Sequence, residues 1–475
     1  MHSSAIVIIV VTILIALYLG STARRNKEMN LEQWTVGGRG FGVLFVFLLL
    51  AGEIYTTFTF LGGSGFAYGV GGPAAYILAY GAIAYVLSYF ILPRIWRYAS
   101  EHKLISQPDY FATRFRSPAL GILVAVVGVV AIVPYLQLQI TGLGLIMEAT
   151  SYGAINNVLA MVIGMLVLAV FVTLSGIHGT AWTAVLKDIV VLAVVLIVGI
   201  ALPAHVGGLQ VMFQKIETLR PHFLILYNNG MGVPWFMSTV ALTGVGFYMW
   251  PHAFGAVYTA KNERVFRRNA TFLPLYQLIL LFVFFAGFAA ILIVPGLKNT
   301  NLALLAAVQK VFPSWFVGVV GGAGVLTALV PGSLLLMTGA TLIAENVYRP
   351  LAHADAKQVQ NVARIMVWVF AAVTLYFSIN SNATIVTLLL MGYNFVTQLF
   401  PSVLLSLFTR QGVNKLGASA GIVVGVIMVI YFMLSGNLIL WGINTGFLAL
   451  LVNFAVVLAV SRATRSTQND VESAA

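Results

Sequence analysis

Polar residues occur where the sequence predicts the middle of a membrane-spanning helix. The segment 51–65 follows an apolar run and contains one carboxylate, Glu53, close to Tyr55, Thr56 and Thr59. An ionised carboxylate at the centre of a bilayer costs roughly 3 kcal/mol or more, so Glu53 is expected to be protonated, hydrogen-bonded or paired with a cation. The segment is therefore a candidate site for an ion or a polar solute.

Two predicted helices carry signs of interruption at membrane depth. Gly52 and the cluster 62–65 (Gly-Gly-Ser-Gly) bracket the first polar segment, and the segment 243–252 contains two glycines and a Trp-Pro pair. Such breaks free backbone amides and carbonyls, which is tolerated only where they face protein or a watery cavity. The two segments lie in corresponding places of two five-helix sets, which indicates a transporter with inverted repeats and a binding site between them. Alternatively, the glycines only permit close helix packing.

Lys187 is the candidate partner for Glu53. It lies about two turns inside a predicted span, so its ammonium group either meets that carboxylate or extends back to the aqueous interface. Asp188 points about 100° away from Lys187 around the same helix, because a helix has 3.6 residues per turn. Asp188 is therefore expected to contact a different helix and not Lys187.

Amide side chains and one histidine are placed at membrane depth in other predicted spans. The amides are Gln137, Gln139, Asn394 and Gln398, and the histidine is His252 in the second interrupted segment. Amides inside a membrane either join helices or bind a ligand. His252 either binds a ligand or hydrogen-bonds a freed carbonyl, and both questions stay open at this point.

Composition places these residues in a polytopic membrane protein. Of the 475 residues, 60% are hydrophobic and 8% are charged, about a third of the charge of an ordinary soluble domain. The chain has no cysteine, which excludes disulfides and thiolate chemistry, and its seven histidines form no metal-binding pattern. We predict an all-α fold of about thirteen transmembrane helices, each able to cross roughly 30 Å of hydrocarbon. Their ranges are 4–21, 41–66, 74–98, 118–148, 153–176, 180–204, 233–258, 272–295, 315–348, 360–379, 382–408, 415–435 and 440–461.

Basic residues are distributed unevenly between the predicted connections. Alternate connections hold twenty of the twenty-five Lys and Arg, whereas the other set holds only Lys215, Arg220, Lys298 and Lys310. Because positive charge is retained on the cytoplasmic side of a membrane, we predict that the N-terminus lies outside and the C-terminus in the cytoplasm. The expected surroundings are a lipid bilayer, and nothing in this distribution indicates nucleic acid.

We interpret 1–475 as a single membrane domain. Its parts are an extra first helix with a cytoplasmic loop (1–40), a first inverted repeat (41–205), a second inverted repeat (233–409), two C-terminal helices (410–465) and a disordered polar tail (466–475). The two long connections, 206–232 and 296–314, are predicted to carry short helices or to act as covers on the outer side.

An ordered set of short motifs resembles the sodium:solute symporter family over nearly the whole chain. The matching pieces are Gly37-Gly38-Arg39, the polar segment 51–65, Pro108-Asp109-Tyr110-Phe111 with Arg114-Phe115, Ala181-Trp182-Thr183 and Glu345-Asn346-Val347-Tyr348-Arg349. The segments 53–56, 184–188 and 328–331 are similar to the bacterial monocarboxylate-uptake branch. The resemblance implies a LeuT-like core of five-plus-five inverted repeats in a bacterial inner membrane. It also implies secondary active symport of a small organic solute, in the first place a monocarboxylate, by alternating access.

The resemblance further implies where a coupling sodium ion would bind. In the family, sodium is held by backbone carbonyls of the broken first core helix, here those of Ala51 and Ile54 beside Glu53, and by two hydroxyls of the eighth core helix. The hydroxyl positions fall on Val330 and Pro331. Both replacements remove hard oxygen ligands of the kind that such a cation needs.

Lys187 offers an alternative to a bound cation. The family's aspartate on core helix 5 falls on Ala184, and Lys187 lies one turn further along nearly the same face. We therefore hypothesise a proton-coupled relative in which Lys187 replaces the sodium ion. The conservative interpretation keeps sodium coupling through Ala51, Ile54 and Thr327. No cofactor is expected beyond the coupling ion, sodium or proton.

The substrate is expected at the midplane between core helices 1, 3, 6 and 10. The predicted lining residues are Tyr55, Thr56, Thr59, Gln137, Tyr248, Trp250 and Asn394. Amides freed at the two breaks are positive and suit a carboxylate.

Other substrates and other classes of protein stay open. An amino acid, a vitamin or a sugar could replace the monocarboxylate. Proteins of another class with these features are a membrane-embedded enzyme that uses Glu53, Lys187, Asp188 or His252 as acid and base, a channel, or a transporter-like sensor. The chain shows no nucleophile-plus-base motif, so we expect no enzyme. We expect the protein to work as a monomer.

Overall fold

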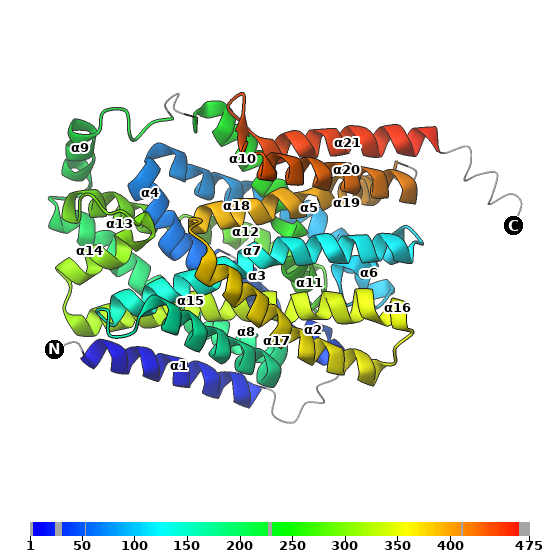
Figure 1. Ribbon diagram of the computed structural model, residues 1–475, viewed down its shortest axis with the longest axis horizontal. Coiled ribbons are helices and arrows are strands. Elements are labelled where there is room, and N and C mark those ends of the chain that lie inside the picture. Colours follow the sequence, from blue (N-terminus) through cyan, green and yellow to red (C-terminus); the bar gives the residue numbers. More distant parts are fainter. Residues whose placement is uncertain (1–2, 24–30, 53, 227–229, 410–411, 465–475) are drawn as a thin grey trace, which may run out of the picture.

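The chain folds as a bundle of long helices. The computed structural model describes residues 3–23, 31–52, 54–226, 230–409 and 412–464. Figure 1 shows most long helices running roughly along the longest axis, with the two termini at opposite ends. Within the described residues, ten helices are long and apolar enough to cross a membrane. The prediction of an all-α polytopic membrane protein is confirmed, while the count of thirteen spans stays a prediction.

The elements follow one another with mostly short connections. The α-helices are α1 (Ser3–Ala23), α2 (Leu31–Val36), α3 (Val43–Gly52), α4 (Ser64–Val70), α5 (Tyr76–Glu101), α6 (Gln107–Arg114), α7 (Pro118–Thr150), α8 (Asn157–His205), α9 (Leu209–Leu219), α10 (Val233–Gly246), α11 (Pro251–Tyr258), α12 (Arg264–Gln277), α13 (Leu280–Ile293), α14 (Ala303–Val311), α15 (Ser314–Thr341), α16 (Arg349–Ala352), α17 (Ala356–Asn380), α18 (Ile385–Val396), α19 (Phe400–Phe408), α20 (Lys415–Leu434) and α21 (Thr445–Ala463). Short 3₁₀ segments are η1 (Gly37–Arg39), η3 (Gly72–Ala75), η4 (Phe247–Met249), η5 (Thr300–Leu302) and η7 (Thr397–Leu399), and π segments are η2 (Phe58–Gly63) and η6 (Leu342–Tyr348). One antiparallel hairpin pairs β1 (Ile439–Leu440) with β2 (Ile443–Asn444).

Both predicted helix interruptions are present. Helix α3 ends at Gly52, and the π segment η2 begins only at Phe58 before it continues into α4. Helix α10 ends at Gly246, and η4 leads to Trp250, whose backbone leaves the helical region (φ −59°, ψ 129°). Pro251 then opens α11, a position where its missing N–H costs nothing. The chain therefore exposes backbone at two places inside the bundle.

Helix α8 covers the two spans predicted at 153–176 and 180–204. A straight helix of its 49 residues would be about 74 Å long, more than twice the thickness of the hydrocarbon layer. Leu168 packs against Gly332 of α15, while the Thr180 hydroxyl lies 3.1 Å from that of Ser333, the next residue of α15. Contacts of two such distant positions with adjacent residues indicate that α8 bends between them.

The two sets of connections lie at opposite ends of the bundle. Figure 1 places α9 and α14 at the end with the N-terminus, and α6, α16 and α19 toward the C-terminus. Because α9 and α14 belong to 206–232 and 296–314, the prediction of short helices there is confirmed. Arg220 lies over the Phe223 ring and donates a hydrogen bond to the Tyr68 carbonyl, so the first of these connections covers the end of α4. Which end faces outside stays a prediction.

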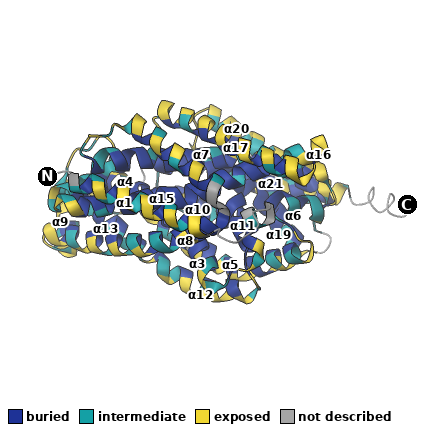
Figure 2. Cartoon of the chain, turned by 90° about the horizontal axis from the view of Figure 1, so that it is seen from below, coloured by how far each residue is buried: buried dark blue, intermediate teal, exposed yellow. Residues whose placement is uncertain are grey.

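Helix α15 forms the centre of the bundle and α1 its edge. In the most apolar stretch of the span that contains α15, 94% of the residues are buried, whereas 22% are buried in the corresponding stretch of α1. Exposed apolar side chains on α1 include Val7, Leu14 and Tyr18, and Figure 2 shows exposed residues on the outer helices. Lipid tails are as apolar as these side chains, so such an exposed surface is suited to a bilayer.

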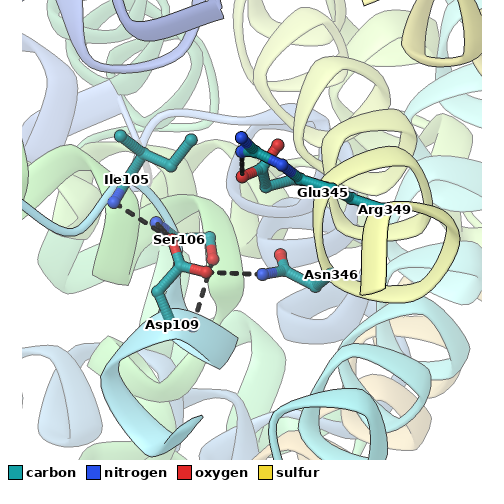
Figure 3. Close-up of polar contacts among 6 residues, drawn as sticks. All are labelled: Ile105, Ser106, Asp109, Glu345, Asn346 and Arg349. Atoms are coloured by element: carbon teal, nitrogen blue, oxygen red, sulfur yellow. Dashed lines mark hydrogen bonds and ion pairs between the residues drawn. The ribbon is translucent and has the colours of Figure 1, made fainter. Parts of the chain in front are cut away.

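Two of the quoted motifs contact each other through Asp109 (Figure 3). Its carboxylate accepts hydrogen bonds from the backbone N–H groups of Ile105 (3.1 Å) and Ser106 (3.0 Å), and from the amide of Asn346 on η6 (2.6 Å). Burial raises the pKa of the Asp109 carboxyl above its ordinary value, and these hydrogen bonds offset part of the rise. Asp109 thus fixes the start of α6 and joins it to the second repeat.

Helix α6 makes further contacts with the second repeat. The Gln107 amide donates to the carbonyl of Met249, in the second break, at 2.8 Å. The Arg114 guanidinium donates to the carbonyl of Ser406 on α19, and the hydroxyls of Tyr110 and Ser406 are 2.9 Å apart. A helix of eight residues is therefore hydrogen-bonded both to the second break and to α19.

Helices α4 and α13 approach closely at Gly287. A β-carbon at this position would lie 2.2 Å from the backbone carbonyl oxygen of Ser64, whereas one at Gly255 of α11 would meet nothing within 4 Å. The two glycines thus differ in the space around them.

We expect Gly287→Ala to lower the free energy of unfolding by about 1–3 kcal/mol, because the added methyl group forces α13 away from α4. The same change at Gly255 is expected to be neutral or stabilising by up to about 1 kcal/mol, since alanine favours a helix. Thermal unfolding of the purified protein in detergent measures both variants. Equal melting temperatures would contradict the close approach.

Candidate functional site

Threonine side chains form hydrogen bonds with the backbone of the first break. The Thr59 hydroxyl donates to the Ile54 carbonyl (2.5 Å), lies 3.0 Å from the Thr56 carbonyl and accepts from the Thr56 N–H (3.1 Å). The Thr56 hydroxyl accepts from the Phe58 N–H at 3.1 Å. In lipid, freed backbone groups must be satisfied within the protein. Thr56 and Thr59, predicted to line the substrate site, therefore lie at the break and maintain it.

Gln139 of α7 reaches the same break. Its Oε1 accepts a hydrogen bond from the N–H of Thr57 at 3.4 Å, and both side chains are fully buried. The β-carbon of Gln139 also faces Gly332 of α15. The break is therefore bordered by α7 and α15, as expected for a site between the two repeats.

Lys187 lies at this break with no exposed side-chain surface. Its Nζ donates to the backbone carbonyl of Tyr55 at 3.3 Å and is 2.9 Å from Oδ1 of Asp188. A β-carbon at Gly52 would be 3.5 Å from the same Nζ, so α3 ends directly against the ammonium group. Lys187 thus does not extend to the interface. Its predicted partner Glu53 lies outside the described residues.

The expectation that Asp188 would contact another helix and not Lys187 is wrong. The two side chains leave the helix about 100° apart, but the four-carbon stem of lysine lets the ammonium group reach back to the neighbouring carboxylate. Both side chains are buried, and a buried charge without a partner is strongly destabilising. The pairing therefore gives each of these two buried groups a partner of opposite charge.

The positions at which the resemblance implies sodium-binding side chains are apolar. Two of them, Ala184 of α8 and Val330 of α15, pack with Leu48 of α3 as a small buried cluster. Their side chains offer no oxygen, and Pro331, inside α15, offers none either. Since sodium requires several hard oxygen ligands, these side chains do not fit it.

Two of the remaining groups of the predicted ion site are engaged within their own segments. The Ile54 carbonyl accepts from Thr59, whereas Ala51 is in the last turn of α3, where helix carbonyls have no partner within the helix. The Thr327 hydroxyl donates to the Gly324 carbonyl of its own helix at 2.6 Å. In the part of the chain that the structure describes, no three His, Asp or Glu form a metal-binding group.

Aromatic rings surround the second break. The Trp250 ring lies 4.7 Å from that of Tyr135 and 5.3 Å from that of Tyr393, measured between ring centroids. Trp250 is 2% exposed and packs against Gly392 of α18, where a larger residue would clash with the indole. The predicted lining residue Tyr248 packs on Phe247 in the same turn. This break therefore presents flat apolar walls between α7 and α18.

His252 lines a mostly apolar hollow next to the second break. The hollow is lined in part by Ser106, Gln107, Thr338 and Thr341. The His252 ring is buried and lies 5.5 Å from the Tyr135 ring. This position leaves both interpretations of His252 open.

Two predicted lining residues point away from the breaks. The Gln137 amide donates to the Phe377 carbonyl of α17 at 3.3 Å. Asn394 lies against Gly446 of α21, where a β-carbon would be 2.1 Å from its Oδ1. The Gln137 amide joins two helices here, which is one of the two roles left open by the sequence, whereas the Asn394 Oδ1 has no hydrogen-bond partner within the described residues.

Gln139 was named among the amides at membrane depth but not among the predicted lining residues, and Tyr276 was not selected from the sequence. The Tyr55 hydroxyl donates to the Tyr276 carbonyl at 3.1 Å, and the two rings pack edge to face at 4.9 Å. Gln139 belongs to the same polar stretch as Gln137, and this stretch was visible in the sequence. The sequence did not show on which face of α7 Gln139 lies. No sequence signal marked Tyr276.

Comparison with known proteins identifies the class of protein. The sequence profile of the Sodium:solute symporter family matches residues 34–425. The substrate-bound, outward-open structure of a Na⁺-coupled sialic acid symporter aligns with a TM-score of 0.80 over 97% of both chains at 16% identity, a likeness of fold. The chain therefore belongs to the sodium:solute symporter family, and its helices form the LeuT-like fold.

Two relatives match over nearly their whole length. The chain is 53% identical to the uncharacterized symporter YhjB of Bacillus subtilis over 98% of each chain. It is 24% identical to a monocarboxylate transport permease of Rhizobium johnstonii over 97% of each chain. The protein is thus similar to bacterial symporters throughout.

The hydroxyl of Thr59 should be essential for the stability of the first break. Thr59→Val keeps the shape but leaves the Ile54 carbonyl and the Thr56 N–H without this partner, at a cost of about 1–3 kcal/mol for each group that stays unsatisfied. We expect a lower yield of monodisperse protein and a melting temperature lower by several degrees. Thr59→Ser retains the hydroxyl and should stay close to the wild type. Indistinguishable Val and Ser variants would show that the hydroxyl is dispensable.

Proposed function

We propose that the protein imports a small organic acid, in the first place a monocarboxylate, by symport with a proton. The symporter class follows from the family. The acid is supported by the monocarboxylate permease that matches the chain from end to end. The proton is supported by a single observation, the buried ammonium group of Lys187 beside an apolar cluster where the family's sodium ligands would lie.

Lys187 acts as a built-in and removable cation in this proposal. A bound sodium ion would link the broken helix to its neighbours through oxygen ligands, and the ammonium group makes the same kind of link from α8 to the Tyr55 carbonyl. When the proton leaves Nζ, the positive charge that holds this carbonyl and the Asp188 carboxylate is lost. Only the charged form then stabilises the observed arrangement of the break, which couples proton movement to the helix rearrangement.

The substrate in this proposal lies between the two breaks. Rings at Tyr55 and Trp250 form apolar walls on either side, and such walls suit the hydrocarbon part of a small acid. Rocking of one repeat against the other exposes the site to each side of the membrane in turn. We also propose that the N-terminus lies outside, as the distribution of Lys and Arg indicates. The chain functions as a monomer in this proposal.

Uptake into proteoliposomes tests the substrate and the ion together. We expect labelled pyruvate, lactate or propionate to accumulate when the outside is made acidic, and no accumulation under a sodium gradient at equal pH. Proline, a vitamin and a sugar serve as comparison solutes. Accumulation of one of those alone would overturn the acid, and accumulation driven only by sodium would overturn the proton.

The role of Lys187 is tested with a variant that avoids a lone buried charge. Lys187→Met together with Asp188→Asn keeps the size of both side chains and leaves neither charge unpaired. We expect proton-driven accumulation to fall at least tenfold, while exchange of labelled for unlabelled substrate across the membrane persists. Exchange needs the substrate site but no net proton movement, so it reports that the variant is folded. An unchanged dependence of uptake on the pH gradient would exclude Lys187 as the proton carrier.

The Lys187→Arg variant separates charge from proton transfer. Arginine stays charged at any accessible pH, so it can replace a fixed cation but cannot release a proton. We expect this variant, too, to lose proton-driven accumulation. Full retention would mean that Lys187 is a structural cation and that another group carries the coupling ion.

A further inference from the structure

We propose that Gln139 and Thr57 form the subsite that binds the carboxylate of the substrate. The inference rests on the proposed function and names the recognition group within it. It starts from two buried hydrogen-bond donors, the Nε2 of Gln139 and the hydroxyl of Thr57, which have no hydrogen-bond partner in the part of the chain that is described. Both side chains have 0% exposure, so water in contact with the surface does not reach them.

The two donors are neighbours at the first break. The Thr57 N–H donates a hydrogen bond to Oε1 of Gln139. This bond fixes the side-chain amide with its oxygen toward the backbone and leaves Nε2 without a hydrogen-bond partner within the described residues. The methyl group of Thr57 packs on α7 at Gly142, where a β-carbon would lie 1.8 Å from it. Gly142 is three residues beyond Gln139 and so on the same face of α7. The side chains of Gln139 and Thr57 are therefore held against each other by packing as well as by a hydrogen bond.

Other polar side chains of the first break already have partners. The hydroxyls of Thr56 and Thr59 are engaged with the broken backbone, and the Lys187 ammonium is engaged with Tyr55 and Asp188. A buried donor without a partner costs about 1–3 kcal/mol. A protein that retains two such donors side by side is prepared for a group that only accepts hydrogen bonds.

A carboxylate is such a group. When ionised it has acceptor sites and no donor, and its hydrogen bonds are stronger than those of a neutral acceptor. A positive charge lies on the same broken segment, since the Lys187 ammonium contacts the carbonyl of Tyr55, two residues before Thr57. A substrate anion and the proton on Lys187 would therefore bind on adjacent stretches of one broken helix, which links the two binding events physically.

Gln137 provides a matched control on the same helix. It is the same residue type two positions away, it is also buried, and its Nε2 is already engaged with the Phe377 carbonyl. Gln139→Leu and Gln137→Leu each remove one amide of similar size. Only the first removes a free donor at the break.

The experiment measures selectivity as well as uptake in proteoliposomes. Wild type, Gln139→Leu and Gln137→Leu are assayed for proton-driven uptake of labelled propionate, and for its inhibition by unlabelled propionate and propionamide. We expect Gln139→Leu to raise the KM for propionate at least tenfold with little change in kcat, and to abolish the preference for the acid over the amide. Gln137→Leu should keep that preference even if its stability is lower. A third variant, Thr57→Val, should raise the KM in the same direction.

The outcomes separate this inference from the function it rests on. If the wild type accumulates no monocarboxylate, the proposed function fails. If the wild type does so and Gln139→Leu keeps both its KM and its preference for the acid, the subsite is wrong and the proposed function stands. If Gln137→Leu loses the preference as much as Gln139→Leu, the effect is one of helix packing and the subsite is overturned as well.

Discussion

The structure depends on satisfying an interrupted backbone inside a bilayer. Between Gly52 and Phe58 the chain leaves the helix, and lipid offers no hydrogen bonds to the groups that this frees. Three kinds of side chain satisfy them: threonine hydroxyls from the break itself, the Gln139 amide from α7 and the Lys187 ammonium from α8. Each partner comes from a different helix, so the break also determines how these helices are placed.

The ion site shows how one fold can change its coupling chemistry with few substitutions. A sodium site needs oxygen ligands from several helices at once, whereas Leu48, Ala184 and Val330 contribute carbon alone. One lysine near this cluster provides a positive charge without any such ligand set. Its carboxylate partner is the adjacent residue of the same helix, so the charged pair does not depend on the position of another helix. The carbonyl of Tyr55, in contrast, belongs to the segment that must move.

Much of the fold was accessible from the sequence because membrane insertion imposes strong rules. Long apolar runs predicted helices, and glycines with Pro251 predicted the two breaks, since few other arrangements are tolerated in lipid. The faces of helices were harder to predict. Gln137 and Gln139 differ by two residues and so by about 200° around α7, and only the packing of α17 and the first break shows which one lies at the site. The pairing of Lys187 with Asp188 was missed for a related reason, because side-chain length outweighed the angle between the residues.

Helix α6 has a mechanical consequence for the transport cycle. It is hydrogen-bonded to the second break through Gln107, to η6 through Asp109 and to α19 through Arg114, and Figure 1 places α6 and α19 toward the C-terminal end of the bundle. Each such bond contributes about 0.5–1.5 kcal/mol, and more where a charge takes part. Opening that end requires several of them to rupture together, whereas thermal motion breaks single bonds readily. Loss of any one of these bonds would accordingly make the others easier to break.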